Sequence, residues 1–204
     1  MKRHLSFRSD ERAASAAEFA LILPVALLFL LGLIDVGRYT WTFNQMEKAT
    51  QAGARWAAAT DLVASGLRTY SFAVNGIVSQ GEVVESDNFG GIVCTSADGT
   101  VTCDCRDNSA CAFGEAADQA AFDLLAQRMF DIYPGIAKDN IRIEYDNALL
   151  GFSGDPNGPD VAPLITVSIV DKEFPLWFML GRTVKMPDAR YTITSEDGQG
   201  DFSY

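Results

Sequence analysis

Residues 13–34 read AASAAEFALILPVALLFLLGLI, and no side chain from residue 19 to residue 34 carries a charge. A helix of these 22 residues is about 33 Å long at about 1.5 Å per residue, which matches a hydrocarbon core of about 30 Å. The stretch therefore predicts a helix that spans a membrane once.

The segment before this stretch is basic, because its positive charges outnumber Asp10 and Glu11. Short basic segments stay on the cytoplasmic side of a membrane, so residues 1–12 are expected in the cytoplasm and everything after Asp35 outside it. A cleaved secretory signal is the alternative, but residues 34–39 read IDVGRY and lack the small-residue pair of a signal peptidase site. The basic residues are Lys2, Arg3, Arg8 and Arg12.

A helical pattern continues beyond the span, with apolar or small side chains every three or four residues. One helix is expected over residues 9–62, and Pro24 favours a kink within it. Small residues at four-residue spacing allow another element to approach closely, and the chain's own globular domain is the favoured candidate. The recurring residues are Phe43, Met46, Ala49, Gly53, Trp56, Ala57 and Thr60.

Beyond residue 66 the pattern changes to short β-like runs separated by Gly, Asp and Asn, which predicts an α+β domain with an antiparallel sheet. Strands are expected at 71–78, 92–103, 141–145, 164–170 and 190–194, and an exposed loop at 147–163. The organisation predicted is a leader at 1–13, a span at 14–35, a helical stalk at 36–65 and an exported domain at 66–204. A helix at 115–131 is expected to turn inward Ala117, Ala121, Leu124, Leu125 and Met129.

All four cysteines lie within the part predicted to be exported, where an oxidising environment allows disulfides to persist. Asp98-Gly99 is a strong signal for a two-residue hairpin turn, and that register places Cys94 opposite Cys103. Cys105 and Cys111 would then close a small loop. A zinc site is the alternative, but the C-x8-C-x-C-x5-C spacing lacks C-x2-C pairs, so disulfides are favoured.

The composition argues against several classes of function. A net charge of −11 does not suit nucleic-acid binding, which needs clustered basic residues. The single histidine, His4, lies in the predicted cytoplasmic tail, so the exported domain has none for a Ser-His or Cys-His site. No glycine-rich phosphate-binding motif follows a strand. The sequence therefore predicts a structural or assembly protein without enzymatic activity, cofactor or metal.

Two exported segments leave alternatives open. Residues 155–160 read DPNGPD and predict a turn, with calcium binding as the alternative; the EF-hand template fails because its twelfth position is Thr166. Residues 174–180 read FPLWFML and predict either a patch that contacts a membrane or partner, or a segment packed under the sheet.

Three stretches carry a resemblance to a known family: residues 10–24 (DERAASAAEFALILP), 31–38 (LGLIDVGR) and 51–58 (QAGARWAA). They resemble the TadE-like family of pseudopilins from tight-adherence (Flp) pilus systems. In that family a membrane prepilin peptidase cleaves a few residues before the Glu-Phe pair, leaving the glutamate fifth in the mature chain. The resemblance implies cleavage between Ala13 and Ala14, although Ala13 stands where such substrates usually carry Gly.

The resemblance also gives Glu18 a role, since its carboxylate could neutralise the new α-amine of Ala14 in a neighbouring subunit. Glu18, Phe19 and Pro24 are the residues expected to serve assembly through the helix. The partners implied are prepilin peptidase, other pilin and pseudopilin subunits and the assembly platform of the bacterial inner membrane.

The function expected is that of a minor pilin or pilus-assembly subunit with a pilin-like exported domain. It is expected in the inner membrane, with the extracellular pilus as a second destination. The alternatives are a membrane-tethered binding module or adhesin that is never processed, and a tethered hydrolase.

Overall fold

The computed structural model describes residues 11–106, 111–155, 160–178 and 181–195, and for residues 11–14 the backbone alone. The predicted leader up to residue 10, including His4, lies outside this range. The chain forms two compact units. The first joins the long helix up to Thr42 to Glu173–Val184, and the second contains Phe43–Lys172 and the chain from Lys185 onwards.

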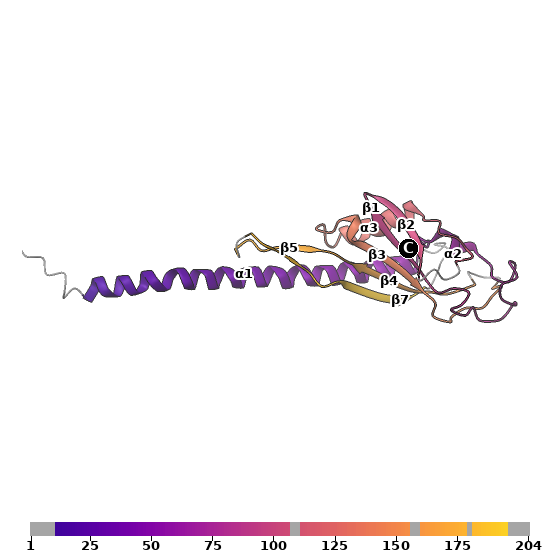
Figure 1. The fold of residues 1–204 in the computed structure, drawn as a ribbon, viewed down its shortest axis with the longest axis horizontal. Helices are drawn as coiled ribbons and strands as arrows, with labels where there is room; N and C mark the ends of the chain where they lie inside the picture. Colours follow the sequence, from indigo (N-terminus) through magenta and orange to yellow (C-terminus); the bar gives the residue numbers. More distant parts are fainter. Residues whose placement is uncertain (1–10, 107–110, 156–159, 179–180, 196–204) are drawn as a thin grey trace, which may run out of the picture. The chain divides into compact units, whose positions relative to one another are not determined.

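The first unit contains the N-terminal part of α1 (Glu11–Ala58) and a hairpin of β5 (Glu173–Pro175) and β6 (Thr183–Lys185). The helix continues through Pro24 and is long and apolar enough to cross a membrane. The hairpin runs alongside α1 (Figure 1), and the Leu176 N–H donates to the Arg182 carbonyl at 2.8 Å. The two strands of the hairpin form a two-stranded sheet of their own.

The helix ends earlier than the predicted residue 62, at Ala58. The Thr60 hydroxyl and the Ala59 N–H both donate to the Trp56 carbonyl, at 2.7 and 3.2 Å. These bonds satisfy a carbonyl that has no helical partner at the end of α1, which closes the helix there.

The second unit is built on a five-stranded antiparallel sheet in the order β2-β1-β3-β4-β7. Alternate residues of β1 and β3 are buried, as expected for strands with one face on a core. The predicted α+β class with a long N-terminal helix is confirmed. The strands are β1 (Ile92–Ala97), β2 (Thr100–Cys105), β3 (Ile141–Asp146), β4 (Leu164–Ile169) and β7 (Ala189–Thr194).

The C-terminal part of α1 packs into this second unit through its small residues. Ala49 and Ala57 are buried, and a Cβ added at Gly53 would lie 2.9 Å from the Met129 side chain and 3.3 Å from that of Val167. Because glycine has no Cβ, α1 can approach both α3 (Gln119–Phe130) and β4 closely at this point. The four-residue spacing therefore serves the chain's own domain, the interpretation that the sequence favoured.

The helix predicted at 115–131 is α3, and its first residue is set by a cap. The Asp118 carboxylate accepts from the Ala120 and Ala121 N–H groups at 2.9 and 3.0 Å, which starts the helix at Gln119. The predicted inward position of Leu124 is wrong, because this side chain is 59% exposed. The buried face consists of Phe122, Leu125, Ala126 and Met129.

Two further expectations need correction. The strand predicted at 71–78 is a series of turns, in which Gly76 has a positive φ of 69° and the Ile77 N–H donates back to the Phe72 carbonyl. The loop at 147–163 is only partly exposed, because Ser153 and Asp160 are buried. The Asp160 carboxylate accepts from the Phe72 N–H at 2.6 Å, so the loop is fastened to those turns. A short helix, α2 (Ser65–Thr69), was not expected.

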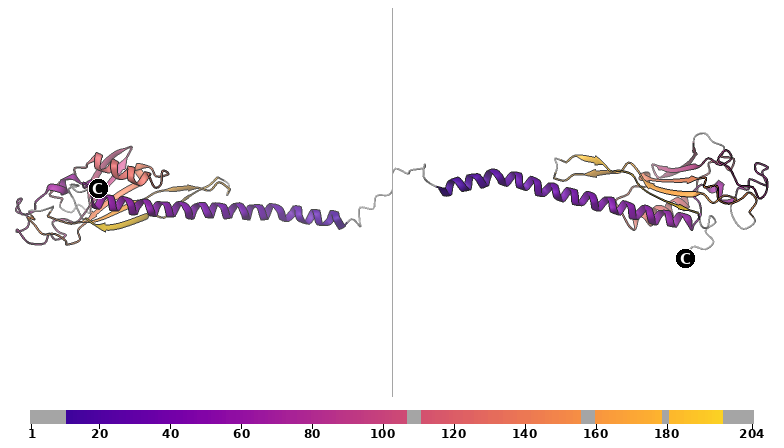
Figure 2. Two further views of the ribbon diagram at one scale, coloured as in Figure 1. Left: turned by 180° about the vertical axis from the view of Figure 1, so that it is seen from behind. Right: turned by 90° about the horizontal axis from the view of Figure 1, so that it is seen from below.

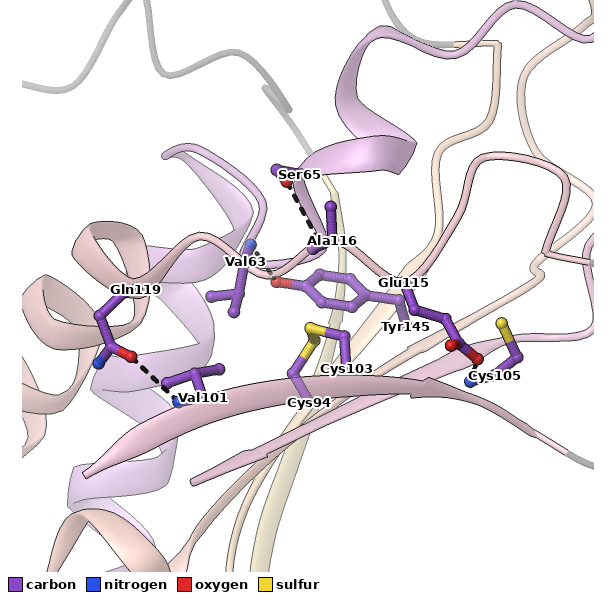
Figure 3. The surroundings of a disulfide bond; sticks show 10 residues. All are labelled: Val63, Ser65, Cys94, Val101, Cys103, Cys105, Glu115, Ala116, Gln119 and Tyr145. Atoms are coloured by element: carbon purple, nitrogen blue, oxygen red, sulfur yellow. Dashed lines mark hydrogen bonds between the residues drawn. A yellow bond between two sulfur atoms is a disulfide. The ribbon is translucent and has the colours of Figure 1, made fainter. Parts of the chain in front are cut away.

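The hairpin of β1 and β2 pairs Cys94 with Cys103 across the turn at Asp98-Gly99, where both residues have positive φ. These two cysteines form a disulfide with their Cα atoms 4.0 Å apart, the pairing that the turn predicted (Figure 3). Cys105 and Cys111 form the second disulfide.

Tyr145 lies close to the first disulfide and is fully buried (Figure 3). Its hydroxyl accepts from the Val63 N–H at 3.0 Å and so links β3 to the segment that follows α1. Burial raises the pKa of the Tyr145 phenol well above its usual range, since a phenolate would have to form away from water.

Replacing Tyr145 with Phe should therefore have an effect that depends on pH. At neutral pH the variant leaves the Val63 N–H without its partner, and we expect a loss of about 1 to 3 kcal/mol in the free energy of unfolding. A raised pKa in the folded state means that the tyrosine stabilises the fold below about pH 10 and loses that contribution above it. The difference between wild type and variant should shrink as the pH rises beyond 10.

Urea unfolding of the full chain in detergent, followed by tryptophan fluorescence at several pH values, measures both effects. Tyr191→Phe is the matched control, because Tyr191 is only half-buried and removal of its hydroxyl should change the free energy of unfolding little. A constant difference across the alkaline range would contradict the role assigned to Tyr145.

The first disulfide should stabilise the second unit by constraining its unfolded chain. Replacing Cys94 and Cys103 together with Ala should lower the free energy of unfolding by about 2 to 3 kcal/mol, the amount expected for a loop of about ten residues. Non-reducing peptide mapping of the wild-type chain should recover Cys94 linked to Cys103, and a link to either other cysteine would disprove the register.

Candidate functional site

The N-terminal part of α1 presents an apolar surface that the described residues of the first unit leave exposed. Most side chains from residue 19 to residue 34 are exposed, and they include Leu21, Val25, Leu28 and Phe29. An exposed apolar surface of this extent requires either lipid or another protein against it. This surface is the first part of the candidate site.

Asp35 directly follows the apolar surface and is completely buried. Its carboxylate accepts three hydrogen bonds: from the Trp177 N–H at 3.2 Å, from the Phe178 N–H at 2.9 Å and from the Arg38 guanidinium at 2.9 Å. Two of these donors belong to the β5–β6 hairpin and one to the next turn of α1. The carboxylate therefore fastens the tip of the hairpin to the helix.

Arg38 completes this connection with its planar guanidinium group. The guanidinium carbon lies 3.6 Å from the centre of the Trp177 ring and 5.0 Å from that of Phe174. Tyr39 meets the Phe174 ring edge to face at 5.5 Å. One cation is thus paired with a buried carboxylate and stacked on aromatic faces, two interactions that suit Arg better than Lys.

We name this group of residues the boundary cluster: Asp35, Arg38, Tyr39, Phe174, Trp177 and Phe178. It lies entirely within the first unit, where the hairpin follows α1 in both views of Figure 2. A buried carboxylate without partners would be strongly unfavourable, so its negative charge is compensated here by the Arg38 cation and two backbone dipoles.

The structure places the predicted assembly residues along α1 and brings none of them into the boundary cluster. Glu18 and Phe19 are exposed, and Pro24 lies inside the helix. Among the residues that the structure describes, Glu18 forms no ion pair or hydrogen bond with another side chain. Ala13 and Ala14 fall within α1, but their side chains lie outside the described part.

Sequence reasoning missed the roles of Asp35 and Arg38. The signal was present, because an acidic residue follows the apolar run directly and a basic residue lies three positions further on.

Residues 174–180 had two open interpretations: a patch that contacts a membrane or partner, and a segment packed under the sheet. The structure shows which of these residues are buried and which are exposed. Phe174 is buried next to α1, Trp177 and Phe178 remain exposed, and Met179 and Leu180 lie outside the described residues.

The residues that the structure describes contain no group of three or more His, Cys, Asp or Glu side chains that could hold a metal ion. An open hollow lies beside residues 71–80, Gly154 and Asp155, and Asp155 is the one titratable side chain in its described lining. Of the predicted turn or calcium segment at 155–160, residues 156–159 lie outside the described part.

A charged cluster beside β3 has a structural explanation. Arg106, the residue after β2, pairs with Glu144 at 2.6 Å and with Asp146, so two ion pairs connect the end of β2 to β3. Burial raises the pKa of the Asp146 carboxyl despite the nearby guanidinium. A partly exposed pair of this kind connects strands and suggests no acid–base chemistry.

Comparison with known proteins matches residues 13–55 to a family described as TadE-like protein. No match was found among the curated proteins or among the solved structures. The matched segment contains the apolar surface, Glu18 and the helical half of the boundary cluster. The resemblance to the TadE-like family is therefore confirmed over residues 13–55, the segment of this chain that carries its candidate membrane and assembly surface.

Proposed function

We propose that this chain is a minor pilin or pilus-assembly subunit of a tight-adherence (Flp) pilus, without enzymatic activity. The observation that carries the proposal is the exposed apolar surface of α1, which lies within the segment that matches the TadE-like family. A helix of this kind can be held by a bilayer and later by the helices of other subunits, since both surroundings are apolar.

In this proposal the chain crosses the bacterial inner membrane once, with its N-terminus in the cytoplasm and its sheet domain outside. Prepilin peptidase removes the basic leader between Ala13 and Ala14. The mature helix then contacts other pilin and pseudopilin subunits and the assembly platform. The two disulfides support an export route into an oxidising compartment.

Glu18 supports the assembly step through its chemistry. A carboxylate just inside an apolar span is unfavourable, by about 2.5 kcal/mol or more at full depth, and normally has a partner. The described residues of this chain supply none by side-chain contact. The α-amine that cleavage would create at Ala14 of a neighbouring subunit is a cation of the right sign for this position.

Cleavage can be tested by expressing the chain with and without a matching prepilin peptidase and measuring intact mass and N-terminal sequence. We expect a peptidase-dependent start at Ala14. Ala13→Gly is the matched variant, and it should be processed at least as fast as wild type because Gly is the usual residue there. If the wild-type chain and Ala13→Gly both stay full-length in the presence of the peptidase, a membrane-tethered binding module or adhesin is favoured instead.

The role of Glu18 can be tested with Glu18→Gln, which keeps the size of the side chain and removes its charge. Recovery of partner subunits in a pull-down from membranes should fall, while the two disulfides should still form. Glu47→Gln removes an exposed carboxylate from the same helix outside the span and is the control. Equal recovery with wild type and Glu18→Gln would contradict the charge-pairing role.

A further inference from the structure

We define the hairpin tip as residues 176–178. It exposes two aromatic side chains. Trp177 is 66% exposed and Phe178 is 38% exposed, even though their backbone N–H groups are held by the buried Asp35 carboxylate. Trp177 already has the Arg38 cation on its ring. The tip therefore has a fixed backbone and free aromatic surface.

The position of this tip along α1 is set by Asp35. The uncharged run of the helix ends at Ile34, so Asp35 marks the level at which a spanning helix leaves the hydrocarbon. Hydrogen bonds of 3.2 and 2.9 Å keep the Trp177 and Phe178 backbone at that level. Any membrane that takes up residues 19–34 therefore brings its headgroup layer to the hairpin tip.

The chemistry of the tip suits this layer. Tryptophan is enriched where a membrane meets water, because its ring is apolar and its indole N–H is polar. Arg38 and Asp35 form a neutral pair, so this pair brings no net charge to the interface. Arg side chains at the end of a span also extend toward the headgroups with their apolar stem on the lipid side.

We propose that the β5–β6 hairpin is a second membrane contact of this chain: its tip, with Trp177 and Phe178, lies in the lipid headgroup region beside α1. Asp35 acts as the positioning residue that holds the tip at this depth. The hairpin fixes how far the helix is inserted, since deeper insertion would move the Asp35–Arg38 pair and the hairpin tip into the hydrocarbon, and shallower insertion would expose apolar side chains to water. The occupant of this surface is lipid.

This inference goes beyond the proposed function. It requires that residues 19–34 cross a membrane, but it does not require cleavage at Ala13 or incorporation into a pilus. A partner subunit covering Trp177 is the competing arrangement, and it predicts a different result when the isolated chain is placed in lipid.

The test uses the full chain with Trp177 as its single tryptophan, obtained with Trp41→Phe and Trp56→Phe. The chain is reconstituted in vesicles of phosphatidylcholine and phosphatidylglycerol, with bromine on the acyl chain either near the headgroup or near the terminal methyl. We expect Trp177 emission to shift to shorter wavelength in lipid and to lose more intensity with the shallow bromine than with the deep one.

Two matched chains give the scale of depth. A chain with only Trp41 places the probe on α1 six positions beyond Asp35, and a chain with only Trp56 places it 21 positions beyond. Quenching by the shallow bromine should decrease from Trp177 to Trp41 to Trp56. If the two Trp→Phe substitutions impair folding, the difference in quenching between wild type and Trp177→Phe gives the quenching of Trp177 with the other two tryptophans retained.

The positioning role is tested in the single-Trp177 chain with Asp35→Ala, and with Glu47→Ala as the control that removes an exposed carboxylate from the same helix. Asp35→Ala should reduce the shallow quenching of Trp177, whereas Glu47→Ala should leave it unchanged. Both chains should still float with the vesicles, because α1 retains its apolar run.

Flotation separates the possible failures. A chain that floats with vesicles while Trp177 stays insensitive to both bromines and fully open to aqueous acrylamide would overturn the hairpin contact and leave the spanning helix in place. A chain that does not float would overturn both. Unchanged quenching in Asp35→Ala would remove Asp35 from the positioning role.

Discussion

The helix α1 has to satisfy two different surroundings with one continuous run of hydrogen-bonded backbone. Its N-terminal part is lined with large apolar side chains that the first unit leaves exposed, and its C-terminal part carries Ala49, Gly53 and Ala57, which are buried in the second unit. A large side chain at Gly53 would meet Met129 and Val167 at once, so the second unit can form only on a narrow helix face. The large residues therefore form the exposed apolar surface of α1, and the small residues allow its C-terminal part to pack in the second unit.

A change of surroundings along a helix needs a marker at the boundary, and here that marker is a charge. A carboxylate at the end of an apolar run would ordinarily draw water toward it or move the helix outward. Asp35 does neither, because its three acceptor bonds come from Arg38 and from two backbone N–H groups of the hairpin. The hairpin thus supplies two of the donors that water would otherwise supply to the carboxylate.

The sequence predicted those features that depend on periodicity or on one local signal. The span follows from uninterrupted apolar side chains, and the pairing of Cys94 with Cys103 follows from the turn preference of Asp98-Gly99. It failed where long-range contacts decide. Residues 71–78 have strand-like composition, but Gly76 and the bond from Phe72 to Asp160 hold them in turns. Leu124 fits a helical pattern as well as Phe122 does, and only the contact with the sheet selects which face is buried.

The hairpin was harder to predict than any other element, because its two strands have three residues each and are too short for a periodic pattern. Its tip is hydrogen-bonded to Asp35, which lies 142 residues away from Trp177 in the chain. The sequence of residues 173–185 alone therefore does not predict the contact with Asp35. The sequence signal is Asp35 at the end of the span with Arg38 three positions on, because a carboxylate there normally has a partner.

The two carboxylates in the N-terminal part of α1 have opposite relations to their own chain. Asp35 is buried and fully supplied with donors from within the first unit, so its charge is compensated whether lipid or protein surrounds the helix. Glu18 is exposed and has no side-chain partner among the described residues, so in an apolar medium a nearby cation would stabilise its charge. A carboxylate whose charge is already compensated within its own chain can hold a segment in position, but it does not favour association with another subunit. A group that is not compensated favours any neighbour that supplies a cation, and it does so more strongly in a medium of low dielectric constant. In our proposals the same helix therefore carries one acid that sets its depth and one that favours a neighbouring subunit.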